Sequence, residues 1–323
     1  MEKIPNNKNQ KESTITKFIG SNLEQNEKMR ELFKDKFESD YFDPATREKT
    51  EEEKKFLDEL SEKMAEFIKR YGGIPIKIPP RLVRFLDWSK ISPDMAQVFA
   101  SLGYGVNKAG YFELDQQTIA IFSDTSSEYP NRIGLANSVA HEFIHANSFQ
   151  SVVVYPGNER SAYRNQRVGL SAGKGRFFDE LNEAITAELN KRFHREFLKD
   201  IDFTASSFKK LQEDIENIKA KVEDASKWVD DLASIHEIPL PDGTTNAIFE
   251  DFEYKEHREK LNKIIDKINE LNPDRFKDRE EIFNIFAKAM ITGEIKELTE
   301  LIETTSGRGS FKKLASSLDL ENI

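Results

Sequence analysis

Apolar residues recur at three- and four-residue steps between residues 51 and 71, a spacing that places them on one face of an α-helix. These positions are Phe56, Leu57, Leu60, Met64, Phe67 and Ile68. Gly72 and Gly73 follow and are typical of a helix end. A weaker helical pattern covers residues 23–37, whereas residues 1–20 are polar and predict a disordered tail.

The pattern changes over residues 74–122, where prolines and glycines interrupt short apolar runs and favour strands and loops. β-Branched residues within 117–122 predict a strand. A helix is predicted over residues 130–149, followed by a β-hairpin or long loop over residues 151–172. Another helix begins near residue 177 and continues past residue 193.

Beyond residue 201 the chain is highly charged and helical in pattern, with predicted helices over residues 208–232, 254–271, 279–290 and 295–302. Two prolines and a glycine in residues 236–244 indicate a long turn between helices. We therefore expect a mostly helical α+β protein with a small antiparallel or mixed sheet. Its predicted parts are a tail (residues 1–20), a central domain (residues 21–203) and a helical C-terminal domain (residues 204–323).

Composition narrows the possible functions. The 323 residues have a formal net charge of −10 with dispersed basic residues, so nucleic acid is not an expected partner. The chain has no cysteine, so a metal site must use His, Asp or Glu. The N-terminus lacks the apolar core of a signal peptide, and no run is long enough to span a membrane. We expect a soluble cytoplasmic protein without a membrane partner.

The motif His141-Glu142-Phe143-Ile144-His145 lies within the helix predicted over residues 130–149. Histidines four residues apart lie one turn apart on the same helix face, so both imidazoles can bind one metal ion. Glu142 lies close enough to the open coordination position to act on a bound water. The motif also occurs by chance, so a third ligand is decisive.

A catalytic zinc ion needs one further protein ligand and keeps its fourth position for water. Glu183 lies in the middle of the amphipathic helix predicted from residue 177. Glu180 and Glu188 of the same helix are alternatives, as is a distant His or Asp. Each glutamate also has a simpler interpretation, because acidic residues on a helix are usually exposed and solvated.

These residues resemble the gluzincin group of zinc metallopeptidases, in which an HExxH helix is followed by a glutamate ligand from a later helix. The match consists of His141 to His145 plus Asn182-Glu183-Ala184-Ile185-Thr186, within residues 117–195. It implies a Zn²⁺ ion bound by His141, His145 and Glu183, with Glu142 as the general base.

The resemblance also implies a two-lobed zincin fold for residues 21–203, with a strand that pairs with extended substrate. Residues 117–122 are our candidate for this strand. Thermolysin-like members carry an acidic residue four positions after the glutamate ligand to orient the first histidine, whereas this chain has Ala187 there. The candidates for that orienting carboxylate are Asp179, Glu180 and Glu188.

Other residues have weaker claims to a role in the site. His194 lies about three turns after Glu183 and could reach the cleft as an electrophile, although we favour a surface or core histidine. Tyr155 and Tyr163 could stabilise an oxyanion, although tyrosines in hairpins more often pack. We assign no role to His236 and His257.

We therefore predict a zinc-dependent hydrolase, specifically a metallopeptidase that cleaves peptide or protein substrates. One alternative is a helical interaction or scaffold protein with a degenerate or accidental motif, whose C-terminal helices bind a protein partner. Another is a toxin-like effector protease with an appended recognition domain. Zinc content distinguishes the scaffold from both proteases.

Overall fold

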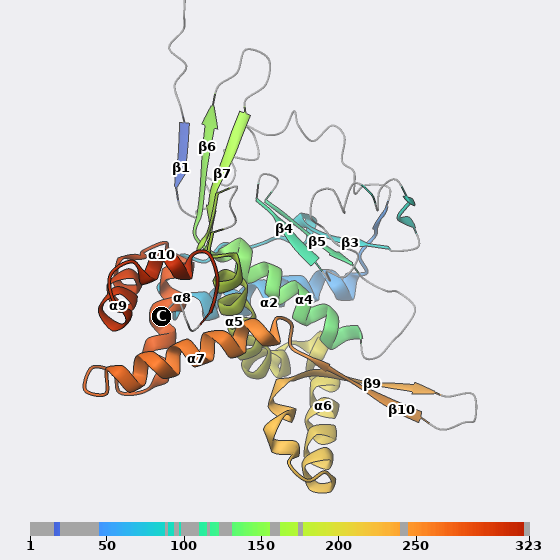
Figure 1. Cartoon of the computed structure of the whole chain (residues 1–323). Helices are drawn as coiled ribbons and strands as arrows, with labels where there is room; N and C mark the ends of the chain where they lie inside the picture. Colours follow the sequence, from blue (N-terminus) through green and yellow to red (C-terminus); the bar gives the residue numbers. More distant parts are fainter. Residues whose placement is uncertain are drawn as a thin grey trace, which may run out of the picture.

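The computed structural model describes residues 16–19, 45–87, 90–93, 97, 110–114, 117–122, 131–155, 162–173, 177–239 and 245–319. The described chain is mostly helical with small sheets, which confirms the α+β class (Figure 1). Its helices are α2 (Glu51–Lys69), α4 (Asn131–Asn147), α5 (Asp179–Phe197), α6 (Asp202–Lys221), α7 (Lys255–Leu271), α8 (Arg279–Thr292), α9 (Lys296–Ser306) and α10 (Ser310–Leu314). The helix predicted over residues 23–37 lies outside the described residues.

A four-stranded mixed sheet lies beside helix α4, with the strand order β2-β3-β5-β4. The bounds of its strands are β2 (Thr46–Arg47), β3 (Val83–Leu86), β4 (Gly110–Glu113) and β5 (Thr118–Phe122). Strand β5 is parallel to β3 and antiparallel to β4. The strand predicted over residues 117–122 is therefore present, but both of its edges are paired within the sheet. It was therefore the wrong candidate for pairing with substrate. The two edge strands of this sheet among the described residues are β2 and β4, and β4 is the one next to β5.

Helix α2 forms where the apolar periodicity predicts it. The Thr50 side chain accepts a hydrogen bond from the Glu53 backbone amide, and the Glu53 side chain accepts one from the Thr50 amide. This capping box satisfies two amides that the first helical turn leaves without partners. All six apolar positions identified in the sequence are buried, so this face of α2 forms one wall of the core.

One hydrophobic cluster extends from Phe56 of α2 to Leu318 near the C-terminus. Helix α4 lies at its centre and packs against α2, α5, α6 and the mixed sheet. Helix α5 packs in turn against α7 and α8. The helices after residue 204 thus share this cluster with the HExxH helix. This arrangement holds α4 and α5 firmly against each other.

A β-hairpin replaces the long turn expected at residues 236–244. Its strands are β9 (Leu232–Pro239) and β10 (Thr245–Asp251), which pair in antiparallel fashion and project from the helical body (Figure 1). The expected helix over residues 208–232 is correspondingly wrong in its second half, because α6 ends at Lys221. The prolines and glycine were interpreted as a helix break, but Pro239 is the last residue of strand β9, whereas Pro241 and Gly243 lie outside the described residues.

Another antiparallel sheet has the order β1-β6-β7-β8 and rises at the top of Figure 1. Its strands are β1 (Thr16–Ile19), β6 (Gln150–Tyr155), β7 (Ala162–Val168) and β8 (Ser171–Ala172). Strands β6 and β7 confirm the hairpin predicted over residues 151–172. Strand β1 lies within the first twenty residues, for which the sequence predicts disorder. None of the described helices has both the length and the apolar character needed to cross a membrane.

Candidate metal centre

Helix α4 brings His141 and His145 to the same side, one turn apart, as their spacing predicts. Their Nε2 atoms lie 3.1 Å from each other, and both residues are buried. The end of the helix is fixed by Asn147, whose side chain donates to the Phe143 carbonyl and accepts from the Ile76 amide. The second imidazole therefore sits on a rigid part of the backbone.

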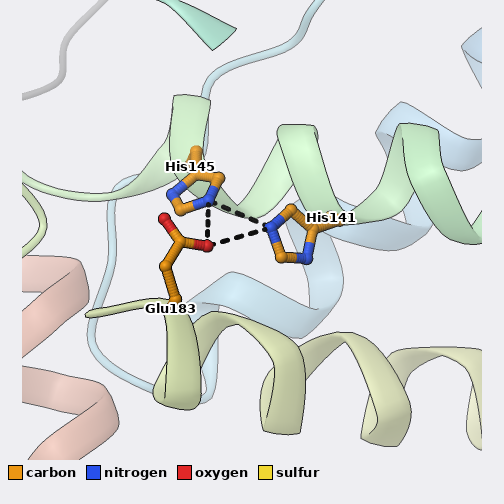
Figure 2. A group of neighbouring side chains, drawn as sticks. All are labelled: His141, His145 and Glu183. Carbon is orange, nitrogen blue, oxygen red and sulfur yellow. Dashed lines mark hydrogen bonds and ion pairs between the residues drawn. The ribbon is translucent and has the colours of Figure 1, made fainter. Parts of the chain in front are cut away.

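Helix α5 supplies Glu183, whose side chain points toward the two imidazoles (Figure 2). Its Oε2 atom lies 3.4 Å from each Nε2 atom. Two asparagines hold α5 in place. Asn182 accepts a hydrogen bond from the Leu170 amide, and Asn190 donates to the carbonyl and side-chain oxygens of Asn137 on α4. The structure thus brings together all three predicted metal ligands.

The separations among these atoms fit a shared metal ion. A tetrahedral zinc site with metal–ligand distances of about 2.0–2.1 Å places its ligand atoms about 3.3 Å apart. The three measured separations are 3.1, 3.4 and 3.4 Å. The buried Oε2 atom of Glu183 accepts no hydrogen bond from any described residue. A buried carboxylate oxygen in this position is costly without a cation, so the residues fit a bound zinc ion.

Glu142 is buried beside the three ligands and has only 6% of its surface exposed. Burial raises the pKa of its carboxyl group, against the opposing effect of His141 and His145. Strand β4 closely covers this side chain, since a Cβ atom added to Gly110 would lie 3.1 Å from Glu142 Cγ. The predicted general base therefore sits between the candidate metal ligands and β4, an edge strand of the mixed sheet.

The charges around the ligands favour a cation. Burial acts to lower the pKa of His141, but its contact with the Glu183 carboxylate and the charges of Glu142 and Glu253 outweigh it and raise this pKa to about 9. Burial acts to raise the pKa of Glu183, but the two imidazoles hold it well below its usual value. A metal ion that bound His141 would therefore displace a proton.

Tyr254 is a further residue of the site, and the sequence did not reveal it. Its ring stacks on that of His141, with the centroids 5.7 Å apart and the planes 16° from parallel. Burial, followed by the charges of Glu183, Glu253 and Glu142, raises the pKa of its hydroxyl, so the phenol stays protonated. Tyr254 follows Glu183 by 71 positions at the start of a charged helix. No local motif marks it, so only the fold reveals its position.

The three candidates for the orienting carboxylate have other partners. Asp179 accepts a hydrogen bond from Ser171, Glu180 accepts one from the Leu318 amide, and Glu188 pairs with Arg192. None of them is a source of the His141 pKa shift, whereas Glu253 contributes to it. The Nδ1 atom of His141 has no hydrogen-bond partner among the described residues, so none of these carboxylates is seen to orient it and the role stays a prediction.

The other histidines and tyrosines considered from the sequence either lie away from the candidate metal ligands or have side chains outside the described part of the structure. His194 is buried in the core against Phe252, and burial lowers its pKa to about 3, so it is a neutral core histidine. Tyr155 and Tyr163 belong to strands β6 and β7, but their side chains lie outside the described part of the structure. His257 contacts the edge of Tyr254 rather than the metal ligands.

Comparisons with known proteins add no constraint on this site. No protein-family model, curated protein or solved structure matches the chain. Its function must therefore be inferred from the chemistry of His141, Glu142, His145, Glu183 and Tyr254.

Proposed function

We propose that this protein is a zinc-dependent hydrolase, and specifically a metallopeptidase of the gluzincin type. The observation that carries the proposal is the convergence of His141 Nε2, His145 Nε2 and Glu183 Oε2 within 3.4 Å of one another, next to the buried Glu142. A chance HExxH sequence has no reason to meet a carboxylate of another helix with one oxygen buried against both imidazoles. Two imidazoles and one carboxylate suit zinc better than calcium or magnesium, which prefer oxygen ligands.

The residues around the ligands have distinct chemical roles in this proposal. When bound, zinc would lower the pKa of a coordinated water toward about 7 and polarise the carbonyl of the substrate. Glu142 accepts the proton of the attacking water and later delivers it to the leaving amine. The protonated hydroxyl of Tyr254 donates a hydrogen bond to the carbonyl oxygen as negative charge develops there. Burial of Glu142 limits exchange with bulk water during these transfers.

Strand β4 supports a peptide as the substrate. Among the described strands it pairs only with β5, so its other edge can accept an extended chain. Gly110 places this strand directly against Glu142. A peptide that adds to the edge of β4 would therefore pass close to the general base.

The activity is tested with zinc-loaded protein and a diverse library of unstructured peptides, with new N-termini identified by mass spectrometry. We expect cleavage that a zinc chelator abolishes and that added zinc restores, because His141, His145 and Glu183 act only through the metal. Cleavage that survives complete zinc removal, or its absence from fully zinc-loaded protein, would contradict the proposal.

Replacing Tyr254 with phenylalanine removes the proposed hydrogen bond but keeps the ring that stacks on His141. We expect kcat to fall about 10²–10³-fold, the usual loss for one donor to a developing oxyanion, while zinc content and KM change little. Steady-state kinetics and metal analysis test this. Tyr71→Phe is the matched control, because Tyr71 packs against Phe67 and Phe283 instead of the metal ligands. Equal effects of the two substitutions would remove Tyr254 from the mechanism.

A further inference from the structure

The segment that carries Tyr254 is held by a buried group of charges. Residues 252–254 connect strand β10 to helix α7, and Tyr254 adopts a left-handed backbone conformation with φ 54°. This conformation is unfavourable for a residue other than glycine and persists only where its surroundings enforce it. The contacts that enforce it therefore determine where the Tyr254 ring lies.

Arg258, one turn into α7, makes those contacts. It is only 3% exposed, and its guanidinium donates to the carbonyl oxygens of Phe252 (3.2 Å) and Glu253 (3.3 Å). These carbonyls belong to the two residues immediately before Tyr254. The planar guanidinium group also donates to Asp231 at 2.8 Å, so one side chain fixes several backbone and side-chain groups at once.

Asp231 links this arrangement to the helix that carries Glu183. Its carboxylate pairs with Lys191 of α5 at 2.6 Å as well as with Arg258, and both cations lower its pKa to about 2 despite burial. Its backbone carbonyl accepts from the Phe252 amide at 2.8 Å. The Phe252 ring packs edge-on against His194, also on α5. The segment before Tyr254 is thus fixed to the same helix as the third metal ligand.

We propose that Arg258 and Asp231 are positioning residues that hold the Tyr254 ring over His141 for the hydrolytic step. This inference rests on the proposed function. Neither residue touches the metal ligands in the contacts described above. Their effect on the reaction is transmitted through the backbone of residues 252–254. The β9–β10 hairpin begins directly after Asp231 and ends directly before Phe252, so its base is closed by the same contacts.

The test is a double-mutant cycle that combines Arg258→Lys with Tyr254→Phe. Lysine retains the charge beside Asp231 but loses the planar fork that reaches both carbonyls. We expect Arg258→Lys to lower kcat about 10-fold with unchanged KM and zinc content, and to cause no further loss in the Tyr254→Phe background. If the fold-decreases in kcat of the two single variants multiplied in the double variant, the two residues would act independently and the proposal would be overturned. Asp231→Asn, which retains the backbone bond to Phe252, is expected to behave like Arg258→Lys.

A second measurement does not depend on activity. In zinc-loaded protein labelled with 3-fluorotyrosine, the ¹⁹F resonance that disappears in Tyr254→Phe belongs to Tyr254. Arg258→Lys should shift or broaden that resonance and leave the others in place, whereas Arg279→Lys, which alters an exposed pair with Asp266, should not. An unchanged Tyr254 resonance in Arg258→Lys would overturn the positioning role. If Arg258→Lys shifted the Tyr254 resonance but the protein cleaved no peptide, the positioning contact would be supported. Only the proposed peptidase activity would then be contradicted.

Discussion

Replacing Glu142 with glutamine is expected to leave one zinc ion bound per chain and to lower kcat about 10²–10⁴-fold. The amide keeps the size of the side chain between the metal ligands and Gly110, so the local packing should survive. It cannot accept the proton of the attacking water at neutral pH. Peptide cleavage kinetics and metal analysis of the same preparation measure both quantities.

The control for this substitution is Glu188→Gln on helix α5, which removes a carboxylate that pairs with Arg192 outside the metal centre. It should retain both zinc and activity. Normal turnover in Glu142→Gln would eliminate Glu142 as the general base. Loss of zinc in that variant would show that Glu142 supports metal binding instead, contrary to the division of roles proposed for the site.

Replacing Glu183 with alanine is expected to weaken zinc binding by more than about 100-fold, because changes to the outer partners of metal ligands alone cost about 10–100-fold. The two imidazoles remain, but the third ligand and its negative charge are removed. Competition with a chromophoric chelator measures the zinc affinity. Hydrolysis should fall in parallel and recover only in part at high zinc concentration.

Glu188→Ala is the matched control, since it truncates a glutamate five positions later on the same helix. It should leave zinc affinity unchanged. If the two alanine variants bound zinc equally, Glu183 would not be a ligand and its position beside the imidazoles would need another explanation.

The candidate metal centre was largely predictable because its residues follow local rules. A four-residue spacing on a helix places His141 and His145 together whatever the rest of the fold. Glu183 was harder to assign, since Glu180 and Glu188 lie on the same helix. The choice depended on a resemblance in residues 182–186, and the structure brings Glu183 alone of these three to the imidazoles.

Features that depend on distant contacts were not predictable. Tyr254 reaches His141 only because a hairpin and the Asp231–Arg258 contacts direct the chain back toward helices α4 and α5. The strand at residues 117–122 was recognised, but its place between β3 and β4 depends on pairing between segments far apart in the sequence. Strands β9 and β10 were missed because prolines and glycines are typical both of helix ends and of the turns between strands.

The central claim is that His141, His145 and Glu183 bind a single zinc ion. Diffraction from zinc-soaked crystals on both sides of the zinc absorption edge tests it most directly. We predict an anomalous peak about 2.0–2.2 Å from both Nε2 atoms and from a carboxylate oxygen of Glu183. The absence of zinc at this position, or zinc bound by the histidines with Glu183 turned away, would contradict the account.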